Sequence, residues 1–441
     1  MIKRLTLALL VLAALLAWPS PAAAHGRSAE ADVRFAQTIA GMELTVVVRA
    51  SIRVPAPLQV DVVAHDPGRG GPVELAVRSV EDGASSAASV RIEAGRPGMY
   101  PAILRAGRVG PHELEVRAGA ERSVLPFTLS VPRAPLWEVI VYASFACAAV
   151  ALIGALVGAA LRRRAVASGF AGAFAVAIVV AFTTGALSPW FAPEGAPDPR
   201  TLTRPNAQPL VEVAPGRPGL GAAFRLRVTL FDGSTGGLAD DLAEHHAALT
   251  HLVVTSDDGR FFRHVHPIRI APGVYEVGLR AERPGRHHAY AEFERTGAGG
   301  QLVSGAFTVD GTGHPGHAGH PAPTGAAPVT VPAQPVAGRP VRITLDTGAT
   351  ALRPWLGMAG HLIVRSQDSG YLGHVHEARS MADATAVRAP DESVARYGPR
   401  LEFVFSFPRP GRYSAWIQYV RDYRIVTVPH VIEVAEEGSG R

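Results

Sequence analysis

The chain has 441 residues, of which 47% are hydrophobic and 18% are charged, and its formal net charge is +5. A chain of this length is longer than a single hydrophobic core usually supports, so two or three domains are expected. The modest charge gives no support for nucleic-acid binding. Because Cys147 is the only cysteine, an intramolecular disulfide is excluded.

The N-terminus has the pattern of a secretory signal peptide. A basic start precedes an apolar run over Leu5–Trp18, and small residues lead up to Ala24. We therefore predict a signal peptide at residues 1–24 and export of the mature chain.

Cleavage after Ala24 would leave His25 as the new N-terminus. Its amine and imidazole, with a further imidazole from His65 or His112, would then suit a copper-chelating brace. Cleavage elsewhere, or a merely exposed His25, is the alternative. A copper-dependent oxidase, monooxygenase or accessory factor that uses His25 is accordingly a third functional class.

Residues 25–135 alternate apolar and polar side chains in short runs such as Leu44–Arg49, with turn signals between them. This texture predicts an extracytoplasmic β-sandwich of immunoglobulin-like size. Pro97–Tyr100 followed by Gly110–Val116 resembles the periplasmic YtkA/FixH-like domains, and also the copper-binding CopC-type sandwiches.

Residues 136–187 predict a transmembrane helical hairpin. Leu136–Leu161 and Ala165–Leu187 are apolar and long enough to span a bilayer, and Arg162–Arg164 connect them. The positive-inside rule places the arginines in the cytoplasm and both flanking regions outside. Gly154 and Gly158 form a small-xxx-small pattern that would let the helices pack closely.

The remaining chain contains two internal repeats. A Pro-rich linker at 188–209 precedes repeat A at 210–310. A linker rich in His, Gly and Pro at 311–327 separates it from repeat B at 328–436, and a short tail occupies 437–441. We expect both repeats to be immunoglobulin- or cupredoxin-like sandwiches. The fold class is therefore mainly β, with three sandwich modules and a two-helix hairpin.

Each repeat contains the same motif, in which one histidine is followed by twelve residues and then by His-Val-His. These motifs resemble a family of secreted, largely uncharacterised bacterial domains with a Met-His-Leu-Val-Val … Phe-x-His-Val-His-Pro core. The chain departs from that core at Thr250 and at Glu377. The resemblance implies small sandwiches and fixes no activity. The six histidines are His251, His264 and His266 in repeat A, and His361, His374 and His376 in repeat B.

Hairpin parity predicts that each trio shares one face of a sheet. His264 and His266 flank one residue of a strand and so point the same way. A two-residue loop at Asp257-Asp258 would place His251 opposite His264, and one at Asp258-Gly259 would place it opposite His266. A three-residue loop would send His251 to the other face.

Three convergent neutral imidazoles suit copper or zinc, and the repeats contain no thiolate. We therefore expect a membrane-anchored protein with its β modules in the periplasm or at the cell surface, which handles a transition metal. The alternative is a non-enzymatic envelope protein with structural histidines and a protein partner. Neither a nucleophile elbow nor a His-Glu-x-x-His motif is present, so we expect no enzyme.

Overall fold

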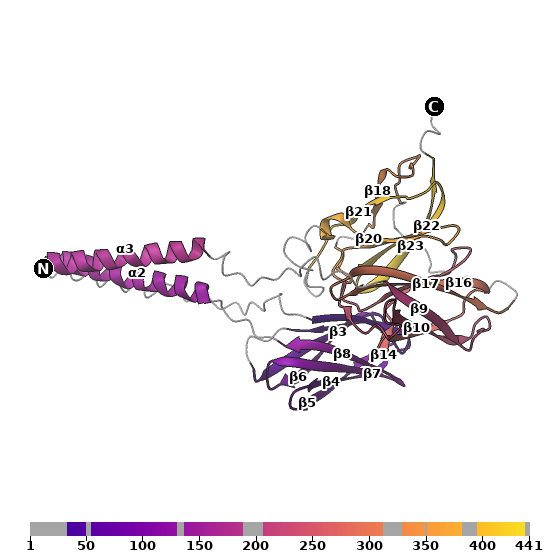
Figure 1. Ribbon diagram of the computed structural model, residues 1–441, viewed down its shortest axis with the longest axis horizontal. Helices are drawn as coiled ribbons and strands as arrows, with labels where there is room; N and C mark the ends of the chain where they lie inside the picture. The colour runs from indigo at the N-terminus through magenta and orange to yellow at the C-terminus, as the bar shows by residue number, and fades with distance from the viewer. Residues whose placement is uncertain are drawn as a thin grey trace. The chain divides into compact units, whose positions relative to one another are not determined.

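A computed structural model describes residues 33–49, 54–129, 136–187, 206–311, 329–348, 351–381 and 395–436. The chain divides into a unit that contains the helical hairpin and a unit that contains the β modules (Figure 1). The protein is mainly β, as expected. The predicted signal peptide, His25 and the histidines of the 311–327 linker lie outside the described residues.

The hairpin consists of α2 (Leu136–Ala160) and α3 (Arg164–Ala186). Their mean hydropathies are 2.4 and 2.3, so length and composition are sufficient for both to cross a membrane. Arg162 turns the chain between them with a left-handed backbone, φ 57°. The helices begin and end within a few residues of the predicted spans.

The small residues of α2 permit the close approach of α3. A Cβ atom at Gly154 would lie 2.6 Å from the Phe170 ring, and one at Gly158 would lie 2.9 Å from the Ala167 backbone nitrogen. Both positions therefore require glycine, which is what small-xxx-small helix packing needs.

The first module is a sandwich of two antiparallel sheets around one apolar core. One sheet has the order β1-β2-β3-β6 and contains β1 (Val33–Ile39), β2 (Met42–Val48), β3 (Ala56–Asp66) and β6 (Gly98–Ala106). The other has the order β5-β4-β7-β8 and contains β4 (Gly71–Ser79), β5 (Ser85–Ile92), β7 (Gly110–Ala118) and β8 (Glu121–Leu129).

Repeat A also has two sheets around its own core. The first has the order β14-β15-β10-β9 and contains β9 (Ala207–Ala214), β10 (Ala223–Asp232), β14 (Ile268–Ala271) and β15 (Val274–Arg280). The second contains β11 (Leu242–Ala243), β12 (His251–Ser256), β13 (Phe262–Val265), β16 (Gly285–Arg295) and β17 (Gly299–Val309).

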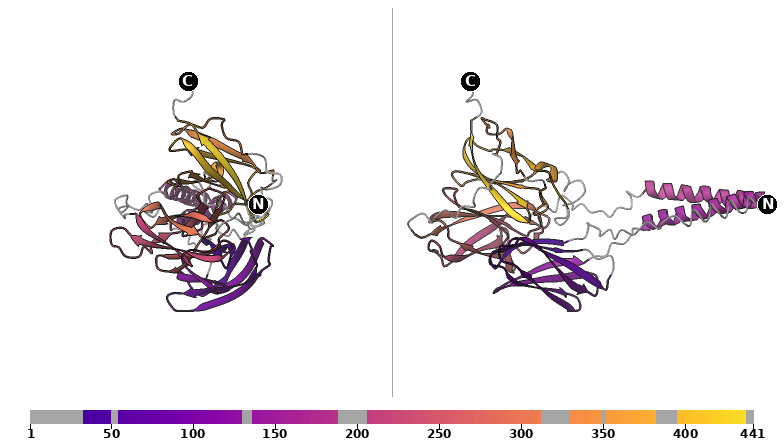
Figure 2. Two further views of the ribbon diagram at one scale, coloured as in Figure 1. Left: turned by 90° about the vertical axis from the view of Figure 1, so that its right-hand side faces the viewer. Right: turned by 180° about the vertical axis from the view of Figure 1, so that it is seen from behind.

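Repeat B has the same histidine-bearing hairpin in a sheet of order β20-β19-β22-β23. This sheet contains β19 (His361–Ser366), β20 (Leu372–His376), β22 (Gly411–Arg421) and β23 (Arg424–Val434), and the last two form the long antiparallel pair drawn in yellow in Figure 2. A second, two-stranded sheet pairs β18 (Pro340–Asp346) with β21 (Arg400–Ser406).

Both histidine hairpins are closed by four-residue loops, whereas the sequence of repeat A predicts a two-residue loop. The Ser256 amide donates to the Phe261 carbonyl and the Gly259 amide to the Ser256 carbonyl, which leaves residues 257–260 as the loop. Because four is an even number, the histidines still share one face. Val253 pairs with His264, which puts His251 in register with His266, the second of the two registers predicted above.

All six residues of β12 and all six of β19 are buried. One face of each strand contributes to the core of its own repeat. The other face joins an apolar cluster shared by the two repeats, formed by Val253, Phe262, Tyr290, Ile363, Leu372 and Trp416. The histidines point to this second face, because His251 and Val253 alternate with the core residue Leu252.

Candidate metal centre

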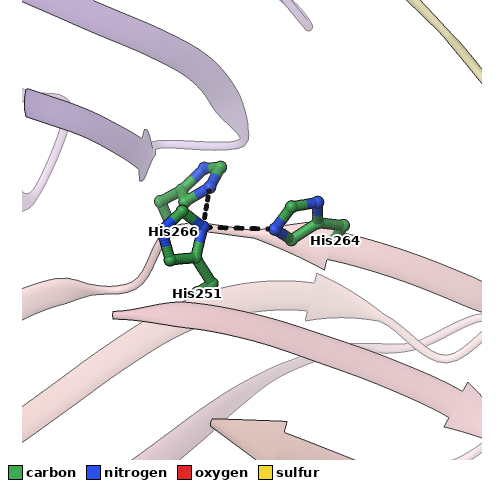
Figure 3. A group of neighbouring side chains, drawn as sticks. All are labelled: His251, His264 and His266. Atoms are coloured by element: carbon green, nitrogen blue, oxygen red, sulfur yellow. Dashed lines mark hydrogen bonds between the residues drawn. The ribbon is translucent and has the colours of Figure 1, made fainter. Parts of the chain in front are cut away.

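The first trio, triad A, brings His251, His264 and His266 together from one hairpin (Figure 3). His251 Nδ1 lies 3.4 Å from His264 Nε2 and 3.2 Å from His266 Nε2. Ligand nitrogens about 2.0–2.1 Å from a tetrahedral metal are about 3.3 Å apart. The spacing of triad A therefore already matches that of a metal-binding site.

The outer nitrogen of each imidazole in triad A contacts an oxygen acceptor. His251 Nε2 donates to the His245 carbonyl at 3.0 Å. His264 Nδ1 donates to Gln418 Oε1 at 2.9 Å, while the amide nitrogen of Gln418 donates to Thr427 Oγ1. His266 Nδ1 pairs with the Glu43 carboxylate. Such outer partners fix the tautomer and direct the other ring nitrogen inwards.

The inner nitrogens of triad A face one another, with His251 Nδ1 opposite the Nε2 atoms of His264 and His266. Burial lowers the pKa of His251 and of His264 well below the usual value, and nearby histidines lower both further, so both rings are neutral. With their outer nitrogens protonated, His251 Nδ1 and His264 Nε2 carry lone pairs and no proton lies between them. A metal ion between the three rings would accept one lone pair from each.

Triad B brings His361, His374 and His376 together in the same way. His361 Nδ1 lies 3.2 Å from His374 Nε2. The outer nitrogens of these two rings donate to the Trp355 carbonyl at 3.0 Å and to Glu292 Oε2 at 2.7 Å. Burial lowers the pKa of His361 well below its usual value.

His376 is the least satisfied member of triad B. Its Nε2 is buried and has no hydrogen-bond partner among the described residues. Burial lowers its pKa, and so do the neighbouring histidines. Its ring packs against His246, with 4.0 Å between ring centroids. Because buried polar atoms normally have a partner, this nitrogen beside two imidazoles could serve as a third metal ligand.

Each repeat orients a triad histidine of the other repeat. Glu292 pairs with His251 in the register of repeat A, and Gln418 pairs with His361 in that of repeat B, so the two occupy equivalent positions. Glu292 binds His374 of triad B, and Gln418 binds His264 of triad A. The exchange is reciprocal, as in an interface with two-fold symmetry.

The first module adds contacts to triad A from outside the repeats. Besides the Glu43 carboxylate on His266, Thr38 binds the His266 backbone in both directions: its Oγ1 accepts from the His266 amide at 3.0 Å and its own amide donates to the His266 carbonyl at 2.7 Å. Triad A is thus held by all three modules, whereas Trp355 and Glu292, which orient triad B, belong to the two repeats.

A cleft of about 1290 Å³ reaches triad A, and its wall includes Glu43, His264 and Gln418. It is lined by all three modules and by six arginines: Arg69, Arg225, Arg263, Arg280, Arg421 and Arg424. Although His264 is only 6% exposed, it therefore lies directly behind a surface that solvent reaches.

The sequence identified all six imidazoles but none of their outer partners. Glu43, Glu292 and Gln418 had no distinguishing pattern, because each acts on a histidine of another module or repeat.

For the predicted N-terminal copper brace, His25 lies outside the described residues. Both ring nitrogens of His65 are engaged, by Thr45 and by the Tyr423 carbonyl, and His112 Nδ1 bonds the Gly110 carbonyl.

The architecture is that of a mainly β protein with tandem sandwich modules and an apolar helical hairpin. Residues 210–313 and 324–436 each match the family described as "Domain of unknown function (DUF8832)", which coincides with repeats A and B. No curated protein matches the chain. The similarity to periplasmic YtkA/FixH-like or CopC-type domains has no counterpart in these matches.

The solved structures that match the chain do so at low sequence identity and with TM-scores below 0.2. Red sea bream transglutaminase is 9% identical, with 53% of this chain and 32% of that chain covered and a TM-score of 0.17. Salmonella alpha-2-macroglobulin mutant Y1175G is 15% identical, with coverage of 90% and 22% and a TM-score of 0.19. The FN1–FN3 domains of chicken CNTN1 are 10% identical, with coverage of 87% and 97% and a TM-score of 0.15. The chain thus spans about a third or less of the first two proteins.

Proposed function

We propose that this protein is a membrane-anchored, extracytoplasmic metal-binding protein whose two histidine triads hold a transition metal, with copper as the preferred ion. The observation that carries the proposal is the convergence of His251 Nδ1 with His264 Nε2 at 3.4 Å and with His266 Nε2 at 3.2 Å, while the outer nitrogens of the three rings contact oxygen atoms. Buried acceptors that face each other are unfavourable unless a cation lies between them.

The choice of copper follows from the donor set. Three imidazole nitrogens without a thiolate suit Cu(II) and Zn(II), and Cu(II) binds such sites more tightly in the Irving–Williams order. Outer carboxylates on His266 and His374 raise the basicity of these ligands. The role we assign is binding and handling of the metal, without catalysis.

Titration of the full-length protein in detergent with Cu(II) and Zn(II), followed by calorimetry, tests the proposal. All variants carry substitutions of the linker histidines His314, His317 and His320, which removes weak background binding. His264→Ala and His374→Ala should each lose one of two equivalents. His288→Ala, whose ring pairs with Asp257 outside the triads, is the matched control and should keep both. Equal binding by wild type and a variant without either triad would contradict the proposal.

The location is a separate part of the proposal. Two helices of spanning length joined by Arg162–Arg164 support a hairpin with its connection in the cytoplasm. Protease added to intact spheroplasts should then digest the β modules. If they were digested only after lysis, the orientation would be the opposite of the one proposed.

A further inference from the structure

The two triads lie against each other across the interface between the repeats. The ring centroids of His264 and His374 are 5.3 Å apart. Those of His251 and His374 are 5.8 Å apart, and those of His264 and His361 are 6.1 Å apart. His251 and His264 of repeat A correspond to His361 and His374 of repeat B, so the last two pairs become each other when the repeats are exchanged. A pseudo-two-fold axis therefore passes between His264 and His374.

The spacing limits how far apart two bound ions can be. A metal about 2 Å from a ring nitrogen lies about 3.2 Å from the ring centroid. With 5.3 Å between the His264 and His374 centroids, two ions held by these rings are therefore at most about 12 Å apart. No other residues separate His264 of triad A from His374 of triad B, because the two rings are in contact.

The outer partners tie the two sites together. His264 of triad A is oriented by Gln418 of repeat B, and His374 of triad B is oriented by Glu292 of repeat A. Trp355 lies between the triads, with its ring 5.4 Å from that of His264 and 5.1 Å from that of His361. Any movement of one repeat relative to the other therefore disturbs both ligand sets.

We infer that the six histidines form one binuclear centre on the pseudo-two-fold axis, which holds two transition-metal ions of the same class, and not two independent sites. This inference rests on the proposed function. Occupation of one triad fixes the interface between the repeats and so pre-orients a ligand of the second triad, which gives positive coupling between the two binding events.

Electron paramagnetic resonance of the full-length protein in detergent, loaded with one and with two equivalents of Cu(II), tests this inference. At two equivalents we expect a broadened spectrum with a half-field transition, the signature of two nearby spins. His264→Ala and His374→Ala are the matched controls: each should bind one equivalent and give a sharp spectrum without the half-field signal.

The outcomes separate the two proposals. Binding of two equivalents with a spectrum that is the sum of two isolated Cu(II) signals would overturn the binuclear centre while leaving metal binding intact. Binding of one equivalent that requires all six histidines would also overturn it, in favour of a single shared ion. Cu(II) binding no stronger than in a variant without either triad would instead refute the proposed function.

Discussion

The most discriminating prediction concerns Glu292, which belongs to repeat A in sequence but serves triad B in space. Its Oε2 accepts from His374 Nδ1 at 2.7 Å. Glu292→Leu removes this acceptor and replaces the carboxylate side chain with an apolar one of roughly similar volume. Loss of an outer partner typically weakens metal binding by about 10- to 100-fold, or about 1.4–2.8 kcal/mol.

Single-site backgrounds make the effect assignable. In a His251→Ala/His266→Ala background only triad B remains, and Glu292→Leu should lower its Cu(II) affinity, measured by competition with a chelator. In a His361→Ala/His376→Ala background only triad A remains, and the same substitution should leave its affinity within about threefold, which is less than 1 kcal/mol. Glu292→Gln is the matched control, because repeat B already carries Gln418 at the equivalent position.

Two results would refute the role of Glu292. One is a greater loss of Cu(II) affinity at triad A than at triad B in Glu292→Leu. The other is an equally large loss at triad B in Glu292→Leu and Glu292→Gln, since glutamine still offers an acceptor oxygen. Either result would mean that the bond between Glu292 and His374 does not orient the ligand.

Three further predictions rest on other contacts. Cu(II) but not Zn(II) should quench the tryptophan fluorescence. Trp355→Phe should remove most of this quenching, because Trp355 lies against both triads. Unchanged quenching in this variant would place the bound copper elsewhere. Arg365→Leu should lower the free energy of unfolding, measured in urea, by about 2–4 kcal/mol. The reason is that the buried guanidinium of Arg365 donates to Thr255 Oγ1 and to the carbonyls of Ser256 and Asp257. A loss below about 0.5 kcal/mol would contradict this prediction. Burial lowers the pKa of His65 to about 4, so the unfolded state binds more protons than the folded state between pH 6.5 and 4 and stability falls as the pH is lowered through this range. The loss of unfolding free energy between pH 7 and pH 5 should be about 2 kcal/mol smaller in His65→Gln than in wild type, and identical pH profiles would refute the role of His65.

Local patterns were sufficient for the elements themselves. The two apolar runs form helices close to the predicted spans, since an apolar stretch of that length has few alternatives. The alternation of side chains placed His264 and His266 on one face because strand periodicity is a property of the backbone. The predicted loop length was wrong: Ser256-Asp-Asp-Gly259 indicated a two-residue turn, whereas Ser256 instead pairs with Phe261 across a four-residue loop.

The histidine spacing determined that each trio shares one face for any hairpin loop with an even number of residues, because such a loop keeps the parity of an antiparallel pair. Only the tertiary structure decided what surrounds them. Glu43, Gln418 and Glu292 reach the triads from a different module or repeat, and the two triads meet across an interface. Contacts between residues up to 228 positions apart depend on how whole sheets pack, which no local spacing encodes.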